Sequence, residues 1–232
     1  MTSRLGHRSI TVTAALVPVL VLGAVLTLLA PPAVAGRGAG RASSFSFLLT
    51  DAGRPAHWDA CQPIPYWYNP AGAPRALGRR ALRLVHTAFA RTAAASGLRF
   101  VYEGRTRLVP YAGGDTTAQL PSNGIALAWS TPGRVPALAG PAIGYGGAVA
   151  VDGIYVRGAV VLDRTWRPPA RGRVAAYQSL LMHEVGHAVG LAHVDDAEQI
   201  MSPHNRGRTR WGAGDRAGLT RVGAAAGCAP RS

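Results

Sequence analysis

One eleven-residue stretch, HEVGHAVGLAH from His183 to His193, restricts the possible folds of this chain more than any other part of the sequence. Residues four apart on a helix share one face, with Cβ atoms about 5–6 Å apart, so we expect His183 and His187 to point the same way. Gly190 can adopt a positive φ, which ends a helix and turns the chain back. That turn would bring His193 to the other two imidazoles. We therefore expect three histidines to converge on one point.

Three neutral imidazoles with an open fourth position are typical of a catalytic zinc ion. Glu184 follows the first histidine on the helix, so its side chain would lie beside the metal. It would not take the coordination position of the metal-activated water. We interpret it as the general base that takes a proton from that water. Two helical histidines alone could be solvated or lie in the core. The added Glu184, Gly190 and His193 at these offsets favour a site for one catalytic zinc ion.

This motif resembles that of the metzincin metalloendopeptidases, and within them the matrixins. The segment 200–203, IMSP, is similar to the family's Met-turn. The resemblance implies a bacterial, secreted zinc endopeptidase that hydrolyses peptide bonds in an extended peptide or protein, with Glu184 as general base. It also implies that Met201 forms an apolar floor under the histidines. Pro203, two residues later, indicates that no tyrosine acts as a further ligand.

The resemblance also implies a cleft between the sheet and an irregular C-terminal part. Substrate would pair with an edge strand, for which 145–151 is our candidate. The pocket for the side chain that follows the cleaved bond would be lined near His183, Val185 and the chain after Met201.

The sequence gives weaker support for metal ions other than the catalytic zinc. The family's second, structural zinc is not expected in this chain. Asp115, Asp152 and Asp163 could bind calcium, but isolated aspartates are also common turn formers.

The remaining pattern predicts an α+β fold with a first amphipathic helix, an active-site helix and a C-terminal helix. The resemblance implies that this fold is metzincin-like, with a small twisted mixed sheet. Pro63 and Pro65 restrict the first strand to an edge or to a strand start. Glu103-Gly104 is expected as a turn and Asp152-Gly153 as a hairpin turn. The expected strands are 64–68, 98–102, 125–129, 147–151 and 154–162, and the expected helices are 74–96, 174–189 and 215 towards 228.

The N-terminal residues read as an export signal, with Arg4 and Arg8 before an apolar run at 10–30 and the small residues AVA at 33–35. The run is also long enough for an uncleaved membrane anchor that leaves the domain outside the cell. The expected organisation is a signal peptide at 1–35, a flexible lead-in at 36–56 and a metallopeptidase domain at 57–232.

The chain is strongly basic, with a net charge of +14 that falls to +12 when Arg4 and Arg8 are removed. Such a charge favours loose association with anionic cell-surface polymers. The arginines are spread along the chain, so no specific nucleic-acid binding is expected, and we expect a monomer. The alternative function is an exported basic module that binds zinc or the cell wall without turnover.

The sequence contains two cysteines, Cys61 and Cys228, both in the part expected to be exported. In an oxidising compartment, a disulfide between them is the simplest interpretation. Alternatively, Cys61 could bind the zinc as an inhibitory thiolate.

Overall fold

The structure is a computed structural model that describes residues 40–111 and 120–230. The expected signal peptide or anchor, the first residues of the lead-in and Asp115 lie outside the described residues. The elements are the helices α1 (Arg80–Ser96), α2 (Arg173–Ala188) and α3 (Ala213–Val222), the short helices η2 (Pro136–Leu138) and η3 (Ala224–Ala226), and the strands β1 (Thr50–Asp51), β2 (Arg54–Pro55), β3 (Ile64–Tyr68), β4 (Phe100–Arg105), β5 (Gly124–Ser130), β6 (Gly144–Val151) and β7 (Ile154–Asp163).

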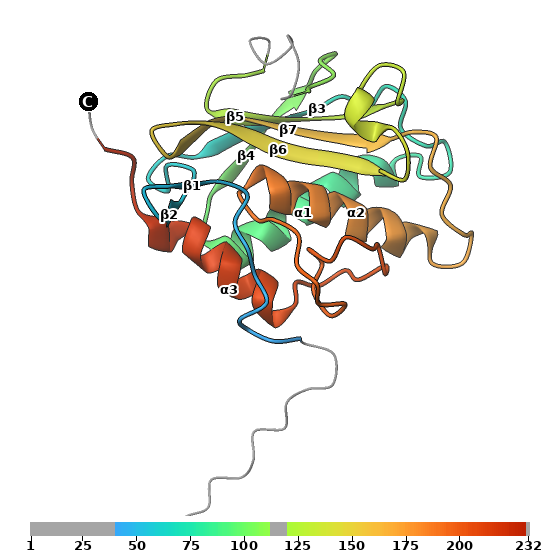
Figure 1. The fold of residues 1–232 in the computed structure, drawn as a ribbon. Coiled ribbons are helices and arrows are strands. Elements are labelled where there is room, and N and C mark those ends of the chain that lie inside the picture. The colour runs from blue at the N-terminus through green and yellow to red at the C-terminus, as the bar shows by residue number, and fades with distance from the viewer. Residues whose placement is uncertain (1–39, 112–119, 231–232) are drawn as a thin grey trace, which may run out of the picture. The chain divides into compact units, whose positions relative to one another are not determined.

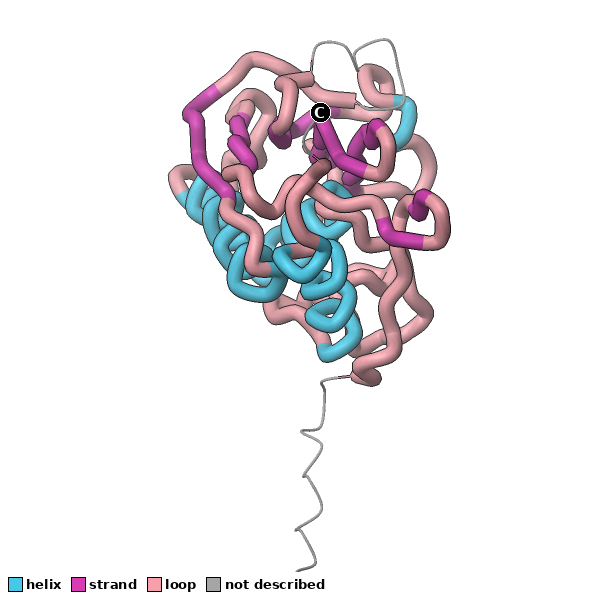
Figure 2. The backbone as a smooth tube through the Cα atoms, turned by 90° about the vertical axis from the view of Figure 1, so that its left-hand side faces the viewer, coloured by secondary structure: helices cyan, strands magenta, loops and turns pink. Residues whose placement is uncertain are grey.

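Five of the strands form one mixed sheet in the order β4-β3-β5-β7-β6. The strands β4, β3, β5 and β7 run parallel to one another, whereas β6 runs antiparallel to β7. The three α-helices lie on one side of this sheet (Figure 1), and a view turned by 90° shows the helices gathered beside the strands (Figure 2). The predicted α+β fold with a mixed sheet is confirmed.

The central strand β5 explains why the sheet needs cover on both faces. All seven of its residues are buried, and its sequence GIALAWS is an apolar run without alternation. That pattern is typical of a strand buried on both sides. The neighbouring β7 is also buried over its last six residues, from Gly158 to Asp163, directly before the chain leaves for α2.

The prediction for the first strand left two alternatives, and the strand start is the one observed. β3 is paired on both sides, with β4 and with β5, so it is not an edge strand, and Pro65 lies one residue after its start. The predicted turn in the next strand is wrong. Glu103 and Gly104 are not a turn but part of β4. There, Gly104 has a φ of +105° and the register between β3 and β4 shifts, which indicates a bulge in β4 rather than a reversal of the chain.

The predicted hairpin is confirmed. Asp152 and Gly153 have φ values of +50° and +75°, which is the conformation of a tight two-residue turn between β6 and β7. Because β6 pairs only with β7 among the described strands, it forms one edge of the sheet, and it contains the predicted edge segment 145–151.

Helix α1 buries its apolar face against the sheet. Phe89 stacks on Tyr66 of β3 with ring centroids 3.9 Å apart. The helix ends at Gly97, whose φ is +75° and whose N–H donates to Ala93 O at 2.8 Å. A left-handed glycine at this position is a common helix end, as the sequence pattern predicts.

The two ends of helix α2 differ in capping and in burial. It begins after Gly172, which has a positive φ and provides no side-chain cap, and no acidic residue occurs in its first turn. From Tyr177 to Ala188, by contrast, all residues except His183 are buried. Gly190 follows with a φ of +115° and turns the chain back, as expected.

The described part of the expected lead-in, residues 40–56, contains β1 and β2, and Phe47 forms an antiparallel β-bridge with Leu191. Among the described residues, no helix is both long enough and apolar enough to cross a membrane.

Candidate active site

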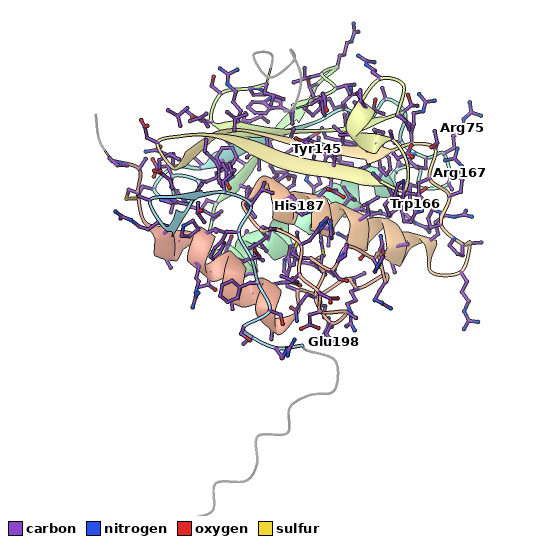
Figure 3. The ribbon with its side chains drawn as sticks, viewed as in Figure 1. Arg75, Tyr145, Trp166, Arg167, His187 and Glu198 are labelled. Carbon is purple, nitrogen blue, oxygen red and sulfur yellow. A yellow bond between two sulfur atoms is a disulfide. The ribbon has the colours of Figure 1, made fainter. Side chains whose placement is uncertain are left out.

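The three predicted histidines meet at one point. The Nε2 atoms of His183 and His193 are 3.0 Å apart, and that of His187 is 3.1 Å from each of them. His183 and His187 come from adjacent turns of α2, and His193 returns after the Gly190 turn. Figure 3 shows His187 on α2, beneath Tyr145 of β6. The three imidazoles could therefore hold one metal ion.

The hydrogen bonds of two histidines fix which nitrogen faces that point. His183 Nδ1 donates to Ile200 O and His187 Nδ1 donates to Leu191 O, each at 2.7 Å. Both Nε2 atoms then carry a lone pair and no proton, so neither can donate a hydrogen bond to the other. The two lone pairs repel each other unless a cation lies between them. Two nitrogens bound to one tetrahedral zinc at 2.0–2.1 Å lie about 3.3 Å apart. The triangle of nitrogens thus fits zinc closely.

Burial keeps these imidazoles neutral, as metal binding requires. Desolvation lowers the pKa of His183 to about 4 and that of His187 to about 3. Repulsion from His193 lowers both pKa values further, and repulsion from His183 also lowers that of His187. Burial also lowers the pKa of His193.

The side chain of Glu184 lies between α2, which carries it, and β6, and the residue is 4 % exposed. Glycines on β6 make room for it. A Cβ at Gly144 would lie 2.4 Å from Glu184 Oε1, and one at Gly146 would lie 2.2 Å from the backbone oxygen of Glu184. Desolvation raises the pKa of Glu184 to about 8. A carboxyl group with a pKa near neutrality can both take up and release a proton there.

The turn beneath the histidines is fixed by a residue that the sequence analysis did not single out. Met201 is buried, and its Sδ would lie 2.5 Å from a Cβ placed at Gly186 of α2. The carboxylate of Asp215, on α3, accepts from the N–H groups of Ile200 at 2.6 Å and Met201 at 3.2 Å. It also accepts from Gly212 N–H at 2.9 Å. An acidic residue near the start of a predicted helix was the available signal, but it does not reveal this distant partner.

The matrixin family matches residues 144–220. These residues run from β6 through the whole histidine motif and most of α3. Residues 144–220 form a matrixin domain. No curated protein matched the chain. A matrixin domain with three convergent histidines indicates a zinc metalloendopeptidase.

A pocket of about 610 Å³ opens in front of the histidines of the matrixin domain. His183, Pro203 and Asn205 contribute to its wall, which agrees with the expected pocket near the chain after Met201. Val185 does not line it, because this side chain is fully buried in the core beneath α2. The remaining lining residues are mostly small or apolar: Leu48, Pro141, Ala142, Ile143, Gly144, Tyr145, Gly146, Ser179, Leu180, Glu184, His187, Ala192, His193 and Ile200.

The cysteines lie outside this pocket and form a disulfide, Cys61–Cys228. The interpretation of Cys61 as an inhibitory thiolate on the metal is therefore wrong. A disulfide indicates an oxidising compartment.

The aspartates considered for calcium have turn roles where they are described. Asp152 lies in the β6–β7 turn, and the Asp163 carboxylate accepts from the N–H and hydroxyl of Thr165 at 2.7 Å. Asp196, which was not a calcium candidate, accepts from Glu198 N–H in the loop after His193, and this bond lowers the pKa of Asp196 to about 2.

Proposed function

We propose that this chain is a secreted endopeptidase that binds one zinc ion through His183, His187 and His193 and uses Glu184 as general base. The convergence of three Nε2 atoms within 3.1 Å, in the wall of an apolar pocket that also contains Glu184, is the observation that carries the proposal. The match of the surrounding residues to the matrixin family supports it.

The protein residues divide the work in a simple way. When bound, zinc would lower the pKa of a water molecule and act as a Lewis acid on the carbonyl oxygen of the substrate. The Nδ1 bonds to Ile200 and Leu191 hold two of the imidazoles in the orientation that binding needs. Glu184, whose carboxylate form is favoured by a nearby positive charge, takes a proton from the attacking water and passes it to the leaving nitrogen.

The substrate would bind in extended form along β6. This strand is an edge of the sheet, and Gly144, Gly146 and Gly147 leave little side-chain bulk on the part nearest the pocket. Backbone hydrogen bonds to such an edge do not depend on the substrate's side chains, so selectivity would come from the pocket.

Turnover and its dependence on the metal can be tested together. Quenched fluorescent peptides should be cleaved by the purified protein, lose cleavage on addition of a zinc chelator, and regain it with added zinc. Glu184→Gln should bind zinc as the parent does while kcat falls at least about 100-fold, the scale of a lost general base. Glu103→Gln, an exposed change on β4, is the matched control and should be neutral.

The outcomes separate this function from its alternative. Wild-type turnover by Glu184→Gln would contradict the assigned base. Binding of zinc without cleavage of any peptide, together with polymer binding that falls steeply with salt, would identify a basic binding module instead. For export, the disulfide gives support, and recovery of the protein in the medium of its producing cells is the direct test.

A further inference from the structure

A segment far from the histidine motif in the sequence runs beside it in the structure. Residues 44–48, called the strap below, lie antiparallel to the chain after α2. Leu48 N–H donates to Gly190 O at 2.8 Å, and Ala192 N–H donates to Ser46 O at 2.9 Å. Figure 1 shows this blue segment passing α3 towards β1. The strap is thus bonded to the residues that directly precede His193.

Helix α3 holds the strap from the other side. Two glycines four residues apart face it: a Cβ at Gly214 would lie 2.1 Å from the backbone oxygen of Ser44, and one at Gly218 would lie 2.9 Å from Phe45 Cβ. The guanidinium of Arg221 lies 4.5 Å above the centre of the Phe45 ring, within cation–π range. Such close backbone contact allows no side chain at Gly214, so the strap is part of the folded domain.

The bridge to Leu191 determines where the strap's side chains point. Successive side chains of an extended segment point to opposite sides. Phe47 packs against the main core, and Leu48 lines the pocket together with Ala192 and His193. The next residue, Leu49, is 43 % exposed and does not line the pocket. Two adjacent leucines therefore have different surroundings.

We propose that Leu48 is a specificity-determining residue that contacts an apolar side chain of the bound peptide. This inference rests on the proposed peptidase function. Leu48 is only half-buried, so apolar surface remains that a substrate side chain can cover. A charged substrate side chain at that point would lose water and gain no partner from the leucine. The substrates it selects are peptides with a large apolar residue at one fixed position relative to the cleaved bond.

The matched pair Leu48→Ala and Leu49→Ala tests this directly. A set of peptides carries leucine or alanine at each position in turn, and kcat and KM are measured for each. For the parent we expect a preference for leucine at one position. Leu48→Ala should reduce that preference about 5–10-fold, the scale of a few lost methyl or methylene contacts, through KM rather than kcat. Leu49→Ala should keep it. An unchanged preference in Leu48→Ala, or equal losses in both variants, overturns the proposal.

A binding measurement separates this inference from the proposed catalysis. The same peptides, labelled with a fluorophore, are titrated into the zinc-loaded Glu184→Gln protein with and without Leu48→Ala. Leu48-dependent binding in a protein whose parent cleaves no peptide would refute the peptidase function and keep the binding role of Leu48. Cleavage by the parent, with binding that is independent of Leu48, would keep the peptidase function and refute the role of Leu48.

The strap's attachment gives a second variant that leaves the pocket residues intact. Gly214→Ala places a methyl group against Ser44 O, so the strap must move away from α3. We expect this variant to lose the same leucine preference as Leu48→Ala. Thr220→Ala, an exposed change on the same helix, should keep the preference, and thermal unfolding checks that both variants remain folded. Full preference in Gly214→Ala would show that the docked strap does not shape the pocket.

Discussion

The carboxylate of Asp215 accepts a hydrogen bond of 2.6 Å from the backbone N–H of Ile200. The carbonyl oxygen of Ile200 in turn accepts one of 2.7 Å from His183 Nδ1. One residue of the turn thus connects the start of α3 with an imidazole of the site. The orientation of His183 therefore depends on a buried acid that does not itself line the pocket.

Replacing this acid should weaken the fold and the site together. Asp215→Ala leaves the N–H groups of Ile200, Met201 and Gly212 without their acceptor in a buried place. We expect the free energy of unfolding to fall by about 3 kcal/mol, measured by urea denaturation, and zinc affinity to fall as well. Asp195→Ala, on the exposed loop, should change stability by less than about 0.5 kcal/mol. Equal effects from both would refute the role of Asp215.

A methyl group on β6 should disturb Glu184 without removing it. Gly144→Ala places a Cβ against the Glu184 carboxylate, so the carboxylate must shift. We expect kcat for peptide cleavage to fall about 100-fold while zinc affinity stays unchanged, because the histidines are not moved. In Gly147→Ala, the nearest atom is the Tyr145 hydroxyl at 3.1 Å, at the end of a side chain, and we expect near-parental kcat. Equal kcat in the two variants would argue against a tightly placed Glu184.

The metal-free protein should lose stability on both sides of about pH 6.5. Folding lowers the pKa values of His183 and His187 from 6.5 to about 4 and 3, so their contribution is complete above pH 6.5 and is lost as the pH falls towards those values. Folding raises the pKa of Glu184 from 4.5 to about 8, so its contribution is complete below pH 4.5 and is lost as the pH rises through 8. Between pH 6.5 and 8, Glu184 therefore dominates among these three groups.

Urea denaturation in the presence of a chelator checks this balance. We expect the parent to lose at most about 2 kcal/mol between pH 6.5 and 8, and Glu184→Gln to lose much less over the same range. Parallel pH profiles for the two proteins would show that Glu184 is not the titrating group.

The disulfide should contribute strongly to stability and little to chemistry. Cys61 and Cys228 are 167 residues apart in sequence, and opening so long a loop costs at most about 5 kcal/mol in chain-entropy terms. The double change Cys61→Ser with Cys228→Ser should lower the melting temperature, while kcat measured well below it stays near the parental value. A large change in kcat in the folded double variant would contradict a purely stabilising role for the disulfide.

The sequence predicts the features that depend on neighbouring residues. The 183–193 motif carries its own geometry, because helical spacing and the glycine turn fix where the histidines go. The Asp152–Gly153 hairpin is local in the same way. The position of β3 inside the sheet does not follow from its own residues, because Pro65 removes only one ladder hydrogen bond and does not prevent pairing on both sides.

Features formed by distant segments were missed for a physical reason. The strap looks like a linker by composition, and its order comes from Leu191 and from the glycine face of α3. The spacing of Gly214 and Gly218 on one face was a readable sign that something packs there closely. It does not say which segment does so.

The uncapped start of α2 has a consequence for motion. The first turn after Gly172 lacks side-chain partners for its N–H groups, whereas the turns that carry His183 and His187 are packed on all sides but one. Amide hydrogens near Arg173 should therefore exchange with solvent quickly, and those around His187 only when the whole domain opens. The first turn of α2 can therefore fray while the turns that carry His183 and His187 keep their shape.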